Sequence, residues 1–557
     1  MRDDVVRPND RGADAGATLD RRTLLRGAVG VAGAAGLATS RLGTLRARAR
    51  QATPAAGEMI PSGVEGVPDA YLTMPAPAAS YDGVPGSGGT VRTFSISYNP
   101  PPPGRDENQF WQELERRLGV TWQPDLTPQP SFGEKSAALI AGGDLPDLYN
   151  LNPGQNAAQQ YQAMAQGAFL DLTPYVTGDA VQAYPNLAAF PAYIWENVKF
   201  QGKILGVPKP LWRNGNLAFY RGDWAQTVGI EAPTDPQQVH DLLVGFSTGD
   251  PDGNGNQDTW GTGRFGGGWD GWDNRLVFPM FGTPNNWRLN DDGTLTHMIE
   301  TEEYRQGLEF LRQLYADGGF HPDSAGMTFT DAQNNFVSGK TGLHTEGFLS
   351  FFGIGNVTYR MQELNPAAQT VGLIPPGPNA AIINETGFFG SVAIPASVGQ
   401  DEERVAELLR ILDYLASPFG SEEYNFLNYG LEGVHHEIQP SGARVINDRG
   451  RAEKSDLVGF MGGQAVYYYP EDPPLAERIQ QIALQALPLG VDDPTLVLYS
   501  ESNISEGAQL SQLGLDRTTA IITGREAMES FDAAVEEWRS RGGDRIREEY
   551  QQALQEQ

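Results

Sequence analysis

The fold class of this chain is decided by the stretch Val91-Arg92-Thr93-Phe94-Ser95-Ile96-Ser97-Tyr98. Its apolar residues alternate with polar ones, as they do in a β-strand that buries one face. A helical pattern follows at 107–118, a second strand at 120–126, a second helix at 134–140 and a third strand at 147–151. Strands that alternate with helices predict an α/β domain built on a mainly parallel sheet.

The ends of these strands indicate where a ligand would bind. Ligands of parallel sheets bind beyond the carboxyl ends of the strands, and the first strand ends at Tyr98 and Asn99. We therefore expect these two residues beside a binding cleft. A second α/β pattern begins near Leu217. The charged segment 526–557 is predicted to be a single surface helix, with apolar contacts at Met528, Phe531, Ala534 and Trp538.

Composition excludes several classes of function. The 557 residues carry a formal net charge of -30, which repels phosphate backbones, and no basic stripe offsets it. Nucleic-acid binding is therefore not expected. Hydrophobic residues make up 39% of the chain, a fraction typical of a folded globular protein. There is no cysteine, which excludes disulfides, thiolate zinc ligands and a lipid-modified cysteine.

The first fifty residues have the pattern of an export signal. Arg21 and Arg22 precede an apolar stretch at 27–38, which is too short to span a bilayer. An arginine pair in this place is typical of the twin-arginine type. The alternative is an unrelated arginine pair before an Ala-rich helix. We predict a signal peptide at 1–50 and an exported protein, in the periplasm or outside the cell, that is not a lipoprotein and has no transmembrane segment when mature.

The segment 51–88 is rich in Ala, Pro, Gly and Ser and shows little periodicity. Such composition is typical of a chain that packs no core of its own, so we predict a flexible linker here.

Five short motifs occur in a characteristic order, each of them weak alone. They are Gly142-Gly143-Asp144-Leu145-Pro146-Asp147-Leu148, Gly202-Lys203-Ile204-Leu205-Gly206-Val207-Pro208, Tyr220-Arg221-Gly222-Asp223-Trp224, Ser338-Gly339-Lys340-Thr341-Gly342 and Asn428-Tyr429-Gly430-Leu431-Glu432-Gly433-Val434-His435. As a set they resemble family 1 extracellular solute-binding proteins of ABC importers, in the larger branch that includes alginate-oligosaccharide binders.

This resemblance implies a two-lobed, periplasmic-binding-protein-like α/β fold, with connections that cross a hinge more than once. The first lobe would hold 88–208 and 380–425, and the second 212–372 and 426–557. The implied function is to capture an oligosaccharide by hinge closure and deliver it to ABC transporter permease subunits. We expect a monomer.

A second motif predicts a calcium site. In Asp250-Pro251-Asp252-Gly253-Asn254-Gly255-Asn256-Gln257-Asp258, oxygen-bearing side chains stand at positions 1, 3, 5 and 9, with a glycine at position 6. An EF-hand has glutamate at position 12, whereas this chain has Gly261, so the loop is incomplete. The alternative is a polar turn without metal. We predict structural Ca²⁺ held by Asp250, Asp252, Asn254, Asn256 and Asp258.

Sugars present apolar C–H faces and a rim of hydroxyl groups, which aromatic rings and polar side chains recognise. Although a tryptophan belongs more often to a core than to a sugar site, this pattern gives a set of candidates. Arg213 and Arg264 would pair with a carboxylate if the sugar were a uronide. The predicted ligand-binding residues are Tyr98, Asn99, Trp212, Arg213, Arg264, Trp269, Trp272, Asp273, Glu346, Phe348, Phe388 and Phe389.

An enzyme is the alternative. The 70 acidic residues supply many carboxylate pairs, so a secreted polysaccharide lyase or glycoside hydrolase has to be weighed. The sequence has no G-x-S-x-G, no H-E-x-x-H and no phosphate-binding loop. We therefore predict no catalytic residue and a binding protein that leaves its ligand unchanged.

Overall fold

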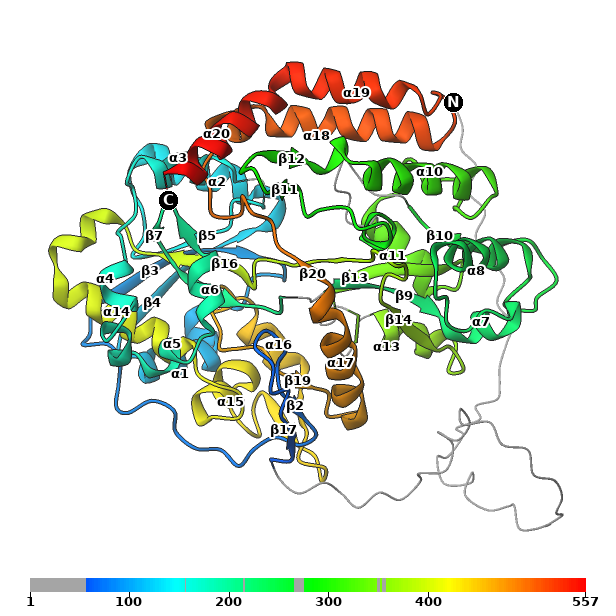
Figure 1. The fold of residues 1–557 in the computed structure, drawn as a ribbon. Helices are drawn as coiled ribbons and strands as arrows, with labels where there is room; N and C mark the ends of the chain where they lie inside the picture. The colour runs from blue at the N-terminus through cyan, green and yellow to red at the C-terminus, as the bar shows by residue number, and fades with distance from the viewer. Residues whose placement is uncertain are drawn as a thin grey trace, which may run out of the picture. The chain divides into compact units, whose positions relative to one another are not determined.

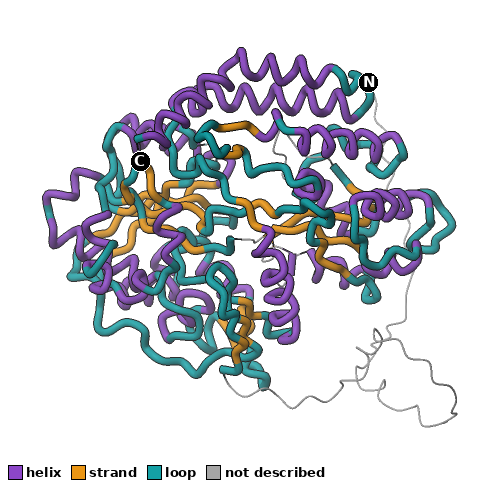
Figure 2. The backbone as a smooth tube through the Cα atoms, viewed as in Figure 1, coloured by secondary structure: helices purple, strands orange, loops and turns teal. Residues whose placement is uncertain are grey.

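The computed structural model describes residues 57–155, 157–213, 216–264, 275–347, 351–352 and 357–556, all within one compact unit at 53–557. The predicted signal peptide lies outside the described residues. Two sheets organise this unit, and Figures 1 and 2 show both with their surrounding helices. No helix in the described ranges is long and apolar enough to cross a membrane.

The first sheet has the strand order β4-β3-β5-β16-β8. β3 runs parallel to β4 and β5, whereas β16 runs antiparallel to β5 and β8. The sheet is therefore mixed. Its first three strands in the sequence, β3, β4 and β5, are parallel, as the sequence predicts. Its strands are β3 (Thr90–Ser97), β4 (Thr121–Pro128), β5 (Leu148–Leu151), β8 (Val207–Pro210) and β16 (Phe388–Ala393).

Helices cover both faces of this sheet. One face packs against α1 and α14 through residues such as Val91 and Val392, and the other packs against α2 and α3 through Phe94 and Tyr149. This alternation follows the period of two along each strand. The helices are α1 (Gln109–Leu118), α2 (Gln129–Gly142), α3 (Gln159–Ala165), α4 (Thr173–Val176), α5 (Pro185–Ala188), α6 (Ala192–Asn197), α14 (Glu402–Leu415), α15 (Glu422–Tyr429) and α16 (Asp448–Lys454).

The second sheet has the order β10-β13-β9-β14. β10 is parallel to β13, and β9 is antiparallel to both β13 and β14. Its strands are β9 (Asn216–Arg221), β10 (Trp260–Thr262), β13 (Thr341–Gly347) and β14 (Thr370–Leu373).

Two helical layers enclose the second sheet. One contains α8, α10 and the C-terminal helices, of which α18 and α19 lie side by side (Figure 1), and the other contains α11, α13 and α17. The helices are α7 (Gly222–Val228), α8 (Pro236–Thr248), α9 (Val277–Met280), α10 (Glu302–Ala316), α11 (Phe329–Val337), α13 (Val357–Leu364), α17 (Pro473–Ala486), α18 (Glu501–Ile522), α19 (Ser530–Trp538) and α20 (Asp544–Gln555).

The chain passes between the two sheets three times. It leaves the first sheet after β8, returns at β16 after β14, and leaves again after α16 toward β19 (Tyr467–Tyr468) and α17. Between the sheets, β15 (Ile382–Ile383) pairs in parallel with β20 (Gly490–Val491). Each sheet with its helices is called a lobe below.

Two segments differ from the predicted organisation. Phe426 and Phe460 pack in the core of the first lobe, although the sequence analysis places 426–557 in the second. The predicted linker at 51–88 contains strands β1 (Met59–Ile60) and β2 (Ala70–Tyr71), and β2 pairs with β19. The side chain of Gln480 donates hydrogen bonds to the carbonyls of Ile60 and Pro68 at 2.9 and 3.0 Å, which ties this segment to α17.

Candidate functional site

A cleft of about 800 Å³ receives residues from both lobes. Strands β8 and β16 and the segment from α15 to β19 supply its first wall. The residues that lead into β9 and the end of β13 supply the second. Besides small residues and glycines, its principal side chains are Lys209, Leu211, Trp212, Asn216, Glu346, Glu385, Phe388, Phe389, Tyr424, Asn428, Tyr429, Lys454, Met461, Gln464 and Tyr468.

A bulge at the start of β16 directs two aromatic rings into this cleft. The register against β8 shifts between Phe388 and Ser391, so both Phe388 and Phe389 are half-buried and line the cavity. Gly390 lies at φ 70°, and a Cβ there would stand 2.9 Å from the carbonyl oxygen of Leu151. The bend therefore needs glycine at this position.

Trp212 forms part of the cleft where the chain leaves the first lobe. Its ring packs against Tyr467, with centroids 4.8 Å apart, and the residue is only 3% exposed. Trp212 is thus both a core residue and a cleft residue. Its indole is positioned by the strand pair that the segment around β2 forms with β19.

The two glutamates of the cleft already have hydrogen-bond partners. Glu346 accepts hydrogen bonds from the Gln333 side chain at 3.0 Å and from the Gly347 backbone N–H at 2.8 Å. Glu385 accepts one from Asn216 at 2.8 Å and pairs with Arg275. Both are consequently fixed in place, with their charge spread over these donors.

Four of the predicted ligand-binding residues line this cleft: Trp212, Glu346, Phe388 and Phe389. Tyr98 and Asn99 are exposed and do not line it. The Tyr98 ring nevertheless lies 6.3 Å from that of Phe389. Trp269, Trp272, Asp273 and Phe348 lie outside the described residues.

The two predicted carboxylate-binding arginines need correction. Neither Arg213 nor Arg264 lines the cleft. Arg213 forms an ion pair with Asp492, which lies 279 residues later, and its guanidinium stacks 5.4 Å above the Tyr193 ring. The Arg213 guanidinium therefore joins two hinge segments through its ion pair with Asp492. This partner is distant in the sequence, so the tertiary structure is needed to identify it.

Sequence reasoning missed Lys209, Lys454 and the residues between α15 and β19. Lys209 directly follows the motif at 202–208 and lies between the predicted lobe ranges 88–208 and 212–372, a position that could have indicated a cleft residue. Lys454, at the end of α16, gave no such signal because the predicted boundary places it in the other lobe.

The predicted calcium loop brings its acidic side chains around one amide. The side-chain N–H groups of Asn254 donate to Asp252 at 2.9 Å and to Asp258 at 3.1 Å, and Asp250 accepts from the backbone N–H groups of Asn254 and Gly255, each at 3.0 Å. Burial, together with the charges of Asp250 and Asp258, raises the pKa of Asp252. The described side chains include no arrangement of three or more His, Cys, Asp or Glu residues that could hold a metal ion.

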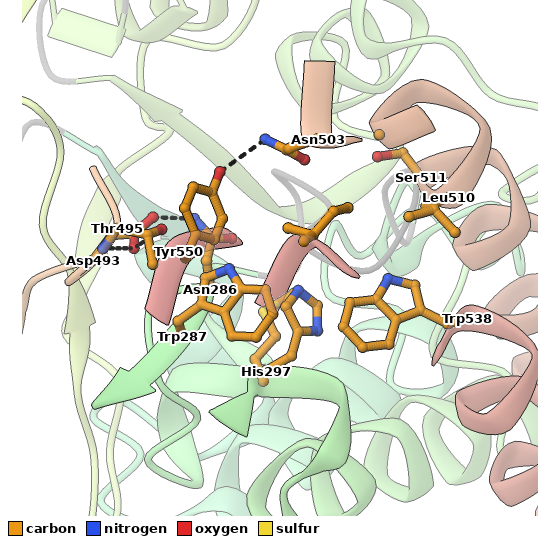
Figure 3. A pocket seen from close by; sticks show the side chains of 13 residues that line it. Asn286, Trp287, His297, Asp493, Thr495, Asn503, Leu510, Ser511, Trp538 and Tyr550 are labelled. Atoms are coloured by element: carbon orange, nitrogen blue, oxygen red, sulfur yellow. Dashed lines mark hydrogen bonds between the residues drawn. The ribbon is translucent and has the colours of Figure 1, made fainter. Parts of the chain in front are cut away.

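A second, smaller cavity of about 250 Å³ lies between the hairpin of β11 (Trp287–Leu289) and β12 (Leu295–His297) and the C-terminal helices (Figure 3). His297 lies between two tryptophans there, stacked on Trp538 with centroids 4.4 Å apart and edge-on to Trp287 at 4.7 Å. Burial and the nearby charge of Arg547 lower the pKa of His297 to about 3. The described residues that line this cavity belong to the second lobe, whereas the larger cleft receives residues from both lobes and is therefore the candidate binding site.

The chain was compared with known proteins by sequence and by structure. No family model matches the chain. The chain is 27% identical to the lipoprotein LipO of Bacillus subtilis, over 83% of this chain and 91% of that protein. It is 24% identical to the polygalacturonan/rhamnogalacturonan-binding protein YtcQ of the same organism, over 83% and 90%. It is also 24% identical to FusA, a fructooligosaccharide ABC transporter substrate-binding protein of Streptococcus pneumoniae, over 61% and 63%.

Solved structures share the fold. An HMO-binding, ABC-transporter-associated solute-binding protein of Bifidobacterium longum infantis aligns with a TM-score of 0.63 at 15% identity, over 84% of this chain and 98% of that one. An EF-hand mutant of FusA of S. pneumoniae in complex with fructo-nystose aligns at 0.61 and 18% identity, over 84% and 99%. The chain is thus similar to ABC-transporter substrate-binding proteins, and it has the predicted two-lobed α/β fold.

The predicted location needs one correction. Because the chain has no cysteine, we predicted that it is not a lipoprotein. LipO contradicts that prediction, because it is a lipoprotein and is similar to 83% of the length of this chain.

Proposed function

We propose that this chain binds an oligosaccharide in the cleft between its lobes and presents it to the permease subunits of an ABC transporter without converting it. The observation that carries the proposal is the cleft itself. Its volume of about 800 Å³ has room for several sugar rings, and aromatic side chains line it. Rings such as Phe388 and Phe389 would pack on the apolar faces of the sugars.

Polar groups of the cleft suit the hydroxyl rim of a sugar. Glu346, Glu385 and Asn216 line the cavity and are held by hydrogen bonds within the second lobe, so they would meet a ligand in fixed positions. Groups held in advance lose little entropy on binding. Among the relatives, YtcQ is a polygalacturonan/rhamnogalacturonan-binding protein and FusA a fructooligosaccharide ABC transporter substrate-binding protein. These ligands support a saccharide substrate for the present chain.

Closure of the lobes would complete the site. The chain crosses between the lobes three times, and one crossing contains Trp212 and the Arg213–Asp492 ion pair. A small number of connecting segments between two lobes allows a hinge rotation that closes both walls of the cleft on a ligand. A single chain supplies both walls, so we propose that the protein acts as a monomer.

We further propose that the loop at 250–258 binds structural Ca²⁺. Its acidic side chains already converge on the Asn254 amide, a positively polarised group that a cation would replace. Bringing acidic side chains together costs free energy unless a cation neutralises them. The existence of an EF-hand mutant of FusA supports a similar loop in that neighbour.

Binding and catalysis can be separated in one experiment. The purified protein is mixed with a panel of neutral and acidic oligosaccharides while tryptophan fluorescence and the size of the saccharide are followed. A saturable fluorescence change with one ligand per chain and an unaltered saccharide is expected. Shortened saccharides would instead identify a lyase or hydrolase, and the lack of any binding would refute the proposal.

A further inference from the structure

Two lysines of the first lobe enter the cleft. Lys209 lies in β8 and Lys454 is the last residue of α16, and both line the cavity. The ammonium group of Lys209 donates a hydrogen bond to the Gly459 carbonyl at 2.6 Å and stands 5.9 Å from the centroid of the Phe389 ring. The cationic group of Lys209 thus lies beside an aromatic ring that lines the same cavity.

Neither lysine has an ion-pair partner among the residues described by the structure, and Lys454 has no side-chain hydrogen bond there either. Asp456 is the acidic group close enough to influence both. Its oxygens, however, already accept hydrogen bonds from Ser97, Tyr98 and Asn99. The positive charge of the lysine pair is therefore only partly balanced.

The acidic groups of the opposite wall are also committed. Glu346 is held by Gln333 and Gly347, and Glu385 by Asn216 and Arg275. The cleft thus has a cationic side, formed by the first lobe, and an opposite side whose carboxylates are bonded within the second lobe. A ligand in this space would meet two ammonium groups whose charge is only partly balanced.

The surroundings make this charge costly in the free protein. Burial, with a smaller contribution from the nearby charge of Lys454, lowers the pKa of Lys209 to about 8, and the charge of Asp456 opposes this shift. Burial likewise lowers the pKa of Lys454. A cation that has lost solvent and lacks a full partner gains most from an anionic ligand.

We propose that the cleft selects an oligosaccharide with an anionic substituent, a carboxylate or a sulfate ester, which binds between Lys209 and Lys454. This inference rests on the proposed function. The whole chain carries a charge of -30 and repels anions at long range. Selectivity for an anionic ligand would therefore have to come from short-range contacts with Lys209 and Lys454. The sugar ring that bears the anionic group would then pack on Phe389.

The test uses calorimetry with oligogalacturonates and oligoguluronates for the carboxylate, sulfated galactan fragments for the sulfate ester, and methyl-esterified oligogalacturonate as the matched neutral ligand. We expect at least one acidic set to bind about tenfold or more tightly than the methyl ester, because a hydrogen bond to a charged group is stronger than one between neutral groups. The preference should weaken when NaCl is raised from about 50 to about 500 mM.

Two variants locate the effect. K454Q and K209Q should each lower the affinity for the acidic ligand about tenfold, and leave that for the neutral one unchanged. K203Q is the matched control, since Lys203 is exposed in β7 (Lys203–Ile204) and does not line the cleft.

The outcomes separate the two proposals. Equal or tighter binding of neutral saccharides, or acidic binding that survives both substitutions, would overturn the lysine site and leave the oligosaccharide function standing. Failure of every saccharide to bind would remove both.

Discussion

Asp456 accepts a hydrogen bond from the backbone N–H of Asn99 at 2.9 Å and so joins two loops that are 357 residues apart in the sequence. The same oxygen accepts from the backbone N–H of Tyr98 and the hydroxyl of Ser97, each at 2.9 Å. Burial alone would raise the pKa of Asp456, but these hydrogen bonds outweigh it and the pKa is lowered. The end of β3 is thereby fixed to the loop that follows Lys454.

We expect D456N to destabilise the fold by about 1–3 kcal/mol, because an amide cannot accept all of these hydrogen bonds and leaves at least one donor unmatched. Urea unfolding near neutral pH measures the loss. E437Q, at an exposed position of β17 (His436–Ile438), is the matched control and should change stability little. The contribution of Asp456 is present at neutral pH and is lost as pH falls through its lowered pKa. A constant difference between variant and wild type down to pH about 2 would contradict this assignment.

Phe389 offers a direct test of the aromatic wall. F389A should weaken oligosaccharide binding about tenfold or more and leave the fold intact, because the ring is half-buried at the cleft and its loss removes a packing surface. Fluorescence titration measures the affinity. Y359A removes an aromatic ring that is 45% exposed on α13 and should leave binding unchanged. Equal effects of the two substitutions would show that the loss is not local to the cleft.

Local patterns predicted the first lobe well. The alternation at 91–98 corresponds to β3 at Thr90–Ser97, and the helical pattern at 107–118 to α1 at Gln109–Leu118. Both elements carry their own signal, a period of two or of 3.6, because each buries one face against the same core. The motif order added the two-lobed fold, which no single segment could show.

Features set by distant contacts were not predictable in this way. Arg213 pairs with a residue 279 positions later, and the segment predicted as a linker is ordered by its pairing with β19. The single helix expected at 526–557 is instead divided between α19 and α20, with Gly542 at φ 144° between them. The adjacent glycines 542 and 543 were a local signal of this break, whereas the lysines of the cleft had none.

The calcium loop can be tested by stability alone. Ca²⁺ at a hundredfold excess over its Kd should stabilise the protein by about 2.7 kcal/mol, and EDTA should reverse this, because the ion binds the folded loop and not the unfolded chain. D252A and D258A should abolish the effect. D291A is the control, since Asp291 is exposed in a hairpin turn that lacks the motif. An unfolding temperature that changes with neither Ca²⁺ nor EDTA would indicate a turn without metal.

His297 should make stability depend on pH. Its folded-state pKa of about 3 lies below the ordinary value of 6.5, so between these values the unfolded chain binds a proton that the folded chain does not. This residue therefore lowers stability as pH falls below about 6.5, by about 2 kcal/mol at pH 5. H297F keeps a ring between Trp287 and Trp538 and should remove that part of the slope in urea unfolding between pH 7 and 5. S511A changes the same cavity without removing a titrating group, and its slope should match the wild type. If H297F and wild type lost stability in parallel, the buried neutral histidine would not be the source of the pH dependence.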